Sequence, residues 1–448
     1  MSLKVRSALA LPAAVAALSA SPAFASETRI DSMGGGVKLW TIEDESNIFD
    51  FPSLLVRWGN RVYVDRIEAT TDDIPGGYFG FHYNLSDETV LAFFGAHINS
   101  GTNGASTGGG TAGNTGYVGS GNLVTGGLSL GNATGPIFGV DGDAVQAVGE
   151  GGPNTSAEYR YGLMFATQLG ATTRFGLSLN IAGDNDDIDS PNNVQTDTGS
   201  LLFDLGLGLG VDLSGSELEL SAGLNIGLLE SAADNVGTGV DLEDVWSGSH
   251  FGLRIGGRWT FDFVSQSKIV AFTQFALASQ DLEQVNTTAV PAPSGSYSQL
   301  SFILGADLRI EPFQGVIVSP GLGFYVAQQT LENPGTVIRD ANLLFGLPFY
   351  SIAVDLKLAD WVAMRFGAQQ FVNMLRESST TAGSTNTHST TDVITTFAWG
   401  LGFDIPVAES ALELDFALNP TFLNNGPNVL TGNTTGPFAL NASLSYHW

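Results

Sequence analysis

The chain has 448 residues, of which 57 are glycine and none is cysteine, and only 14% of them are charged. Its 45 acidic residues against 17 Lys and Arg give a formal net charge of -28, which argues against nucleic acid as a partner because phosphate binding needs a basic surface. Without cysteine the chain has neither a disulfide framework nor a lipoprotein anchor. A mean hydropathy of +0.14 with so few charges favours a protein that turns an apolar face to lipid.

The first residues have the pattern of a secretory signal peptide. Lys4 and Arg6 precede an apolar run over 8–18, and the small-residue site Ala23-Phe24-Ala25 follows it. We therefore assign 1–25 to a signal peptide and expect the mature chain to start at Ser26. Without Lys4 and Arg6, 15 basic residues oppose 45 acidic ones, a net charge of -30. No later apolar run approaches the ~20 residues of a membrane helix.

The segment from Ser26 to Trp58 differs from the rest of the mature chain because it has no period of two. It joins a glycine run, an acidic cluster and a Pro-containing turn: Met33-Gly34-Gly35-Gly36, then Glu43-Asp44-Glu45, then Ser46-Asn47-Ile48-Phe49-Asp50-Phe51-Pro52-Ser53-Leu54-Leu55. This order resembles the N-terminal segment of FadL-type outer-membrane transporters, whose Asn-Pro-Ala turn corresponds here to Phe51-Pro52-Ser53.

That resemblance implies a hatch. FadL-type proteins carry hydrophobic compounds across the outer membrane, and their N-terminal segment folds inside a β-barrel. We therefore expect 26–58 to be a hatch and 59–448 to be an outer-membrane barrel. The implied hatch or gate residues are Gly34, Gly35, Gly36, Ile48, Phe49, Phe51, Pro52 and Ser53.

From Arg61 onward the chain is a series of alternating segments. Over 201–213, Leu, Phe and Val at every second position alternate with Gly and Asp, and 217–228, 250–263 and 299–310 repeat the pattern. A strict period of two predicts strands with unlike solvents on their two faces. Segments of about ten or more residues suit tilted membrane-crossing strands better than strands of a soluble sandwich.

Connections between the segments alternate in length. Short turns are predicted near 86–87, 170–171, 214–216, 265–266, 312–314, 359–360 and 407–409. Long polar loops are predicted at 100–156, 184–197, 231–249, 281–296, 332–340, 379–390 and 424–436. This predicts an all-β, antiparallel, up-and-down transmembrane barrel of about 14–16 strands, with short periplasmic turns and long external loops. The FadL family has fourteen strands, and our count of the segments is nearer sixteen.

The last segment, from Phe438 to Trp448, alternates and stops on an aromatic residue. It resembles the closing strand of outer-membrane barrels, and the resemblance implies that Phe438, Tyr446 and Trp448 form the signal read by the barrel-assembly machinery. Trp259, Trp361 and Trp399 are expected near strand ends or on lipid-facing positions, as in interfacial girdles. Together these features predict the outer membrane of a Gram-negative-type bacterium, reached by signal-peptide-dependent export, with lipid and lipopolysaccharide as partners.

Charged residues on the strands fall on the polar face. Glu217 with Glu219, and Glu413 with Asp415, are two apart and so share a face, which could supply the acid and base of a glycoside hydrolase. The alternative, a pore wall of balanced charges, is favoured because the arginines also fall on that face. The predicted lumen charges are Arg160, Arg174, Asp204, Glu217, Glu219, Arg254, Arg258, Asp307, Arg309, Asp355, Arg365, Glu413 and Asp415.

Other chemistry has weak support in the sequence. Asp184, Asp186, Asp187 and Asp189 lie in a predicted external loop, and such carboxylates could hold Ca²⁺, but the spacing lacks the Gly and bidentate Glu of an EF-hand. We expect no cofactor beyond loosely bound divalent cations. No nucleophile, base and orienting group can be assembled by motif, so an enzyme is not expected.

Two functional hypotheses remain. The first is a transporter or channel for passive passage of hydrophobic or small amphipathic solutes, gated by the hatch. The second is a non-transporting outer-membrane scaffold, surface or secretion-partner protein that acts through its long polar loops, the largest being 100–156. A tightly filled lumen with no continuous opening would favour the scaffold.

Overall fold

We analysed a computed structural model, which describes residues 27–34, 41–68, 77–97, 159–189, 194–235, 244–264, 267–284, 294–332, 338–381, 384–408, 410–418 and 439–448. Three short helices come first: α2 (Glu27–Ser32), η1 (Glu45–Phe49) and η2 (Pro52–Arg57). Sixteen strands follow: β1 (Arg61–Glu68), β2 (Gly77–Ser86), β3 (Thr89–His97), β4 (Tyr159–Gln168), β5 (Thr173–Asp189), β6 (Val194–Leu213), β7 (Ser216–Asn235), β8 (Asp244–Val264), β9 (Ser267–Gln284), β10 (Ser294–Phe313), β11 (Val316–Glu332), β12 (Ile338–Ala359), β13 (Val362–Thr381), β14 (Ser384–Val407), β15 (Ser410–Leu418) and β16 (Ala439–His447).

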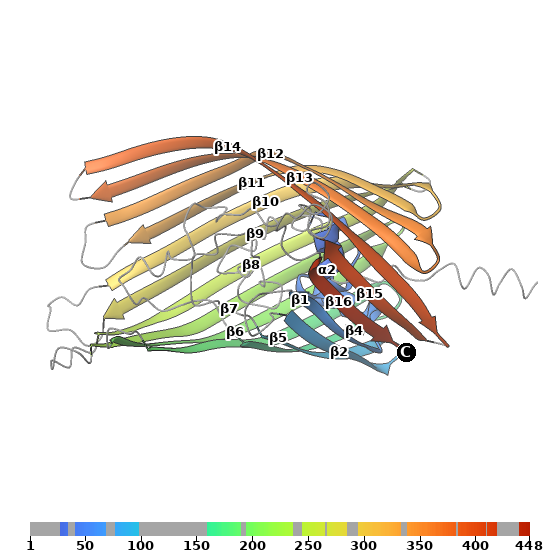
Figure 1. The fold of residues 1–448 in the computed structure, drawn as a ribbon, viewed down its shortest axis with the longest axis horizontal. Helices are drawn as coiled ribbons and strands as arrows, with labels where there is room; N and C mark the ends of the chain where they lie inside the picture. Colours follow the sequence, from blue (N-terminus) through green and yellow to red (C-terminus); the bar gives the residue numbers. More distant parts are fainter. Residues whose placement is uncertain are drawn as a thin grey trace, which may run out of the picture.

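The strands form one closed antiparallel barrel in which each pairs with its neighbours in the sequence and β1 pairs with β16 (Figure 1). At this seam Val62 faces Tyr446 and Val64 faces Leu444, and a bulge follows Val64. Closure removes the sheet edges, which is the condition for crossing lipid with strands. The predicted fold class is confirmed, with sixteen strands. Among the helices that the structure describes, none has the length and hydropathy needed to cross a membrane.

The two faces of the wall match the alternation in the sequence. On β6, Leu205 and Leu207 are 40% and 43% exposed on the outside of the barrel, whereas Asp204 between the exposed positions is 7% exposed. The same contrast separates Leu224 and Ile226 from Asn225 on β7. Large apolar side chains that point outward around the barrel are explained by lipid as the outer solvent.

The outward face gives a depth test. Leu207 lies midway along the outward apolar run of β6, and Leu213 lies at its end. We expect Leu207→Arg to destabilise the barrel by about 2–4 kcal/mol and Leu213→Arg by about 0–1 kcal/mol, because a charge at the bilayer midplane is costlier than one at the interface. Unfolding in urea from lipid vesicles measures both. Equal costs for the two variants would contradict a lipid-facing β6.

The short connections that the structure describes lie at or next to the predicted positions, and the predicted turn at 265–266 lies outside the described residues. Gly170, Gly215 and Gly315 have positive φ angles of 79°, 75° and 78°, which glycine adopts without a Cβ penalty. Ala408, in the last of these turns, also has a positive φ, of 56°. The loops at 184–197, 231–249, 281–296, 332–340 and 379–390 are shorter than predicted, because the flanking strands run on and pair beyond their apolar portions. A loss of apolar alternation therefore did not mark the end of the strand, because backbone pairing does not depend on the polarity of the side chains.

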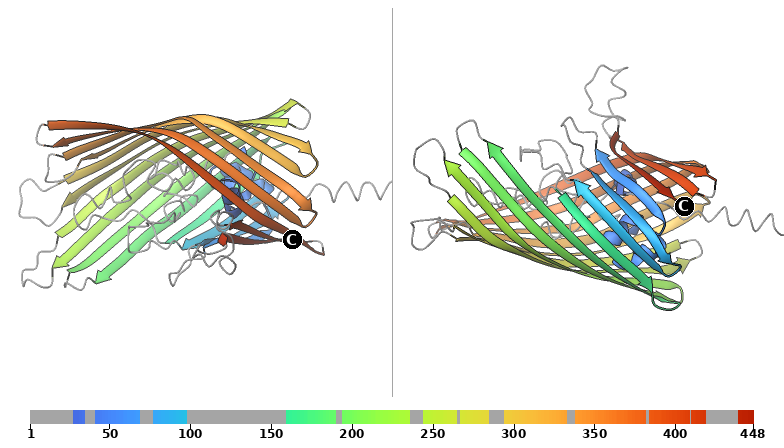
Figure 2. Two further views of the ribbon diagram at one scale, coloured as in Figure 1. Left: turned by 45° about the horizontal axis from the view of Figure 1, so that its top comes forward. Right: turned by 90° about the horizontal axis from the view of Figure 1, so that it is seen from below.

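The wall has unequal height in the described residues. Strands β5 to β14 have 17 to 24 residues, whereas β15, β16 and β1 to β4 have 8 to 10. The three helices lie inside the barrel, at the end that carries the short connections and the C-terminal residue (Figures 1 and 2). We call Glu27–Gly34 and residues 41–58 the hatch from here on.

Candidate functional site

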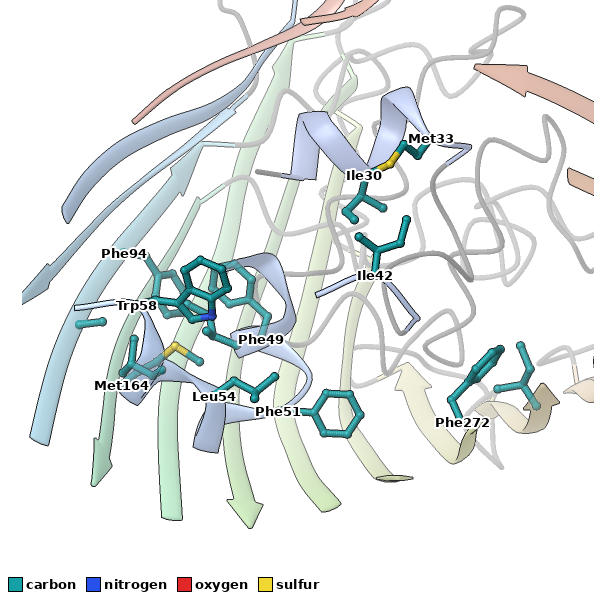
Figure 3. Close-up of a cluster of buried hydrophobic side chains, with 14 of the residues drawn as sticks. Ile30, Met33, Ile42, Phe49, Phe51, Leu54, Trp58, Phe94, Met164 and Phe272 are labelled. Atoms are coloured by element: carbon teal, nitrogen blue, oxygen red, sulfur yellow. The ribbon is translucent and has the colours of Figure 1, made fainter. Parts of the chain in front are cut away.

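Apolar side chains of the hatch are packed inside the barrel (Figure 3). Ile48 and Leu54 are 0% exposed, and Phe49 and Phe51 are 8% and 3% exposed. The Phe49 ring meets the Phe94 ring of β3 edge-on, with 5.0 Å between centroids. The predicted gate residues Ile48, Phe49 and Phe51 therefore lie in the lumen.

Glycines on the inner wall make room for the hatch backbone. A Cβ on Gly176 of β5 would collide with the carbonyl of Pro52, and one on Gly208 of β6 would lie 2.6 Å from the amide nitrogen of Ser53. A second seat lies across the lumen, where a Cβ on Gly367 of β13 would collide with the carbonyl oxygen of Met33. Any side chain at these positions would displace the hatch.

Ion pairs and hydrogen bonds join η1 and η2 to the wall. The Asp50 carboxylate accepts from Arg254 of β8. Asn47 accepts from Arg258 over 2.9 Å, and Ser53 donates to Glu219 of β7 over 2.5 Å. Further contacts join Arg57 to Glu217 and Glu45 to Arg61, each at 2.5 Å.

The helix α2 is held on the other side of the lumen. Thr28 Oγ1 donates to Asp65 of β1 over 2.6 Å, and Arg29 lies 2.8 Å from Asp355 of β12. Gln369 of β13 donates to the carbonyl oxygen of Gly34 over 2.5 Å, where Gly34 has a φ of 107°. The hatch is thus attached to widely separated strands, and it can leave the lumen only by breaking several buried polar contacts.

The predicted lumen charges form networks where their side chains are described. Arg174 lies 2.6 Å from Asp212, 2.8 Å from Glu217 and 2.6 Å from Glu219. Arg365 binds Asp415 and lies 3.7 Å from Asp355. Three further carboxylates accept hydrogen bonds from neighbouring side chains: Asp204 from Asn180, Asp307 from Ser319 and Glu413 from Ser445. Arg254 and Arg258 bind the hatch, and Arg309 is partly buried.

Some predicted site residues lie outside the described residues. These are Gly35, Gly36, Phe438 and the side chain of Arg160. Tyr446 and Trp448 are described: their rings stack 6.1 Å apart, and Trp448 also stacks on Phe81 of β2 at 6.0 Å. Trp259 and Trp361 are exposed as expected. Trp399 pairs with the outward Phe366 in the register, and its own side chain is 7% exposed.

The predicted calcium loop is not a loop. Asp184, Asp186, Asp187 and Asp189 belong to β5, which pairs with β6 along this stretch. The side chains of these four residues lie outside the described part of the structure, so the calcium site stays a prediction. The described side chains contain no cluster of three or more His, Asp or Glu suited to a metal ion. Loosely bound divalent cations remain a prediction.

The buried apolar cluster that contains the hatch side chains extends onto the inner wall of β9 to β13. Phe272, Ile303, Tyr325, Phe349 and Phe371 are 0–3% exposed on β9 to β13, and the Phe349 and Phe371 rings lie 5.9 Å apart. An inner wall with aromatic groups can contact apolar solutes as well as hold a hatch.

The acidic start of η1 is locally ordered. Asp44 caps the helix: its carboxylate accepts from the amide of Ser46 over 2.9 Å, and the Asn47 side chain accepts from the Asp44 amide over 3.0 Å. This reciprocal pair is a capping box. Burial raises the pKa of Asp44 to about 7 and that of Glu45 to about 8, because a charged carboxylate loses water there.

Raised pKa values make hatch docking pH-dependent. Glu45 binds its proton more tightly in the docked hatch, so docking is fully favoured below the ordinary pKa of 4.5 and weakens as the pH rises through about 8. The chain has no cysteine, so Ile48→Cys is a unique reporter whose maleimide labelling measures hatch release. Between pH 5 and pH 8, labelling should increase several-fold more than for a free thiol. Adding Glu45→Gln should reduce that excess, and an unchanged excess would contradict the assignment.

Several hatch contacts were missed by the sequence analysis. The sequence does not show which way a single polar side chain points when it lies outside a periodic segment. For this reason the contacts of Thr28, Arg29 and Arg57 were not predicted. Gly176, Gly208 and Gly367 could have been noticed, since each takes an inward position on an alternating strand where a polar side chain is usual.

Comparisons with known proteins add little. No family model and no curated protein matches the chain. Among solved structures it is similar to the toluene transporter TodX of Pseudomonas putida (10% identity, 94% of this chain and 97% of that chain, TM-score 0.37). It is also similar to the alcaligin outer-membrane receptor FauA of Bordetella pertussis (7%, 86% and 74%, TM-score 0.39) and to the ferric yersiniabactin uptake receptor FyuA of Yersinia pestis (10%, 64% and 49%, TM-score 0.38).

The chain spans about half the length of the yersiniabactin receptor. At these TM-scores the likenesses carry no argument about substrate or mechanism. The assignment as an outer-membrane-type β-barrel rests on the closed strand order and the outward apolar face. This fold is the one used by outer-membrane transporters and receptors.

Proposed function

We propose that the protein is a FadL-type outer-membrane channel for passive passage of hydrophobic or small amphipathic solutes, gated by the hatch. The observation that carries this proposal is the seating of the hatch. Pro52 and Ser53 are buried against Gly176 and Gly208. Apart from the chain that runs from η2 into β1, the described contacts between the hatch and the wall are non-covalent. Such a plug closes the lumen and can be released.

The chemistry of the inner wall supports apolar solutes. Aromatic groups face inward in addition to the charged networks, and they favour contact with apolar solutes. They include Phe94, Phe272, Tyr325, Phe349 and Phe371. Export to the outer membrane, insertion by the barrel-assembly machinery, and contact with lipopolysaccharide belong to the same proposal. No step of it requires an enzymatic group.

Proteoliposomes test the proposal. Uptake of toluene, a small hydrophobic probe, should be faster into vesicles that contain the full-length protein than into protein-free vesicles. Vesicles that contain the 26–58 deletion should also take up small polar solutes. If vesicles with either protein are no more permeable than protein-free vesicles, the transport role is wrong. Correct folding of the deletion variant is checked by its resistance to unfolding in cold sodium dodecyl sulfate.

A scaffold remains the second candidate, and one observation favours it. The hatch is attached to β1, β7, β8, β12 and β13, which could hold it closed permanently. In that case the full-length protein passes no solute, while the 26–58 deletion opens an aqueous pore. The same vesicle experiment therefore separates the two functions.

A further inference from the structure

One row of inward positions crosses six strands next to the hatch. In the strand register Phe94 of β3 faces Gly162, Gly162 faces Asn180, Asn180 faces Asp204, Asp204 faces Asn225, and Asn225 faces Gly252 of β8. The central three residues form a polar strip, and glycine lies at each end of that strip. Two strand spacings make the strip about 10 Å wide.

The polar strip has unpaired hydrogen-bonding groups. Asn180 donates to Asp204 over 2.9 Å, but its side-chain oxygen has no hydrogen-bond partner. Asn225 is 0% exposed, and neither its amide nitrogen nor its amide oxygen has a partner in the described protein. A buried amide without partners costs stability, and the flanking Leu224 and Ile226 show that Asn225 points into the lumen.

The hatch closes over this row. The position that a Cβ on Gly162 would take lies next to the Phe94 ring and to the side-chain oxygen of Asn180. The Phe49 ring packs on the Phe94 ring with 5.0 Å between their centroids. At the other end, Arg254 donates to the carbonyl oxygen of Phe49 over 3.2 Å. The Phe49 ring thus packs on the aromatic end of the row, where the side-chain oxygen of Asn180 also lies.

We propose that the row is a subsite for a small neutral aromatic solute that carries a hydroxyl group. The solute ring replaces that of Phe49 against Phe94, and its hydroxyl donates to the unpaired side-chain oxygen of Asn180, which borders Gly162 together with Phe94. A hydrocarbon leaves the amides unpaired, which a site built for hydrogen bonding rejects. A carboxylate is repelled by Asp204. This inference rests on the proposed function, because the solute enters as the hatch moves.

Three probes of the same shape test the subsite: p-cresol, toluene and 4-methylbenzoate. Equilibrium dialysis with the full-length protein in detergent, corrected for empty micelles, should show p-cresol binding about tenfold tighter than the other two, as expected for one buried hydrogen bond. Asn180→Leu should remove the preference. Gln274→Leu is the matched control, because Gln274 is an inward, buried amide with an unpaired oxygen outside the row, and it should keep the preference.

Equal affinities of the unmodified protein for the three probes would overturn the subsite. This comparison does not depend on the folding of any variant. A preference that survives Asn180→Leu would overturn it as well, since the side-chain oxygen of Asn180 would then not be the acceptor of the solute hydroxyl. Transport is scored separately in proteoliposomes. If toluene is taken up and p-cresol is not preferred, the proposed channel function is supported and the subsite is rejected. If p-cresol binds selectively but no solute is taken up, the channel function is rejected and the subsite is supported.

Discussion

Replacing Arg254 with methionine is expected to release the hatch. Arg254 binds the Asp50 carboxylate and the Phe49 carbonyl oxygen, and the Arg254 and Asp50 side chains are 11% and 5% exposed. Removing one partner of a buried ion pair costs about 3–5 kcal/mol, because the other charge stays buried and unpaired. Labelling of the Ile48→Cys reporter should rise at least about 100-fold.

A double-mutant cycle separates the ion pair from general disruption. Asp50→Asn removes the charge that Arg254→Met would strand, so the double variant should be labelled more slowly than Arg254→Met alone. Additive effects of the two changes would mean that Asp50 and Arg254 do not stabilise docking as a pair. Resistance of the barrel to unfolding should be nearly unchanged in all three variants, since the strands keep their pairing.

Gly176→Ala is expected to open the channel, although it adds one methyl group. The new Cβ would overlap the Pro52 carbonyl, and the hatch would have to move by roughly 1 Å or more to restore van der Waals contact. Overpacking of this kind costs about 1–3 kcal/mol, enough to raise the released fraction about 5–150-fold. Ion conductance across planar bilayers measures the effect.

Gly223→Ala supplies the matched control. Gly223 also lies on the inner wall, but its added Cβ would meet nothing nearer than Arg254 Nε at 3.6 Å. This substitution should leave conductance at the level of the unmodified protein. If Gly176→Ala behaved in the same way, the glycines would not be the seat of the hatch.

Alternation determined which parts of the structure could be predicted. Leu205 and Leu207 face lipid while Asp204 faces the lumen, and such contrasts on successive strands predicted the barrel, its faces and its turns. The acidic stretch 184–189 was misread as a loop, because alternation reports the solvent on each face while strand pairing depends on the backbone. Strand β5 continues past its apolar portion since β6 beside it still accepts and donates hydrogen bonds.

The inside of the barrel was less accessible to sequence reasoning. Arg254 and Glu219 could be placed on the inner face, but their partners Asp50 and Ser53 come from a segment without period and far away in the chain. Which hatch residue meets which wall residue depends on the curvature of the closed sheet. The resemblance to FadL-type segments supplied the location of the hatch, and only the structure supplies its contacts.

The position of α2 limits how the molecule can be assembled. This helix precedes β1, yet it touches β1 at the start of the wall and β13 to β16 at its end, on both sides of the β1–β16 seam. A completed cylinder of strands would leave it no sideways entrance to that place. The helix can therefore arrive before the seam closes or through the open end of the cylinder, and in place it holds the first and last strands of the wall together.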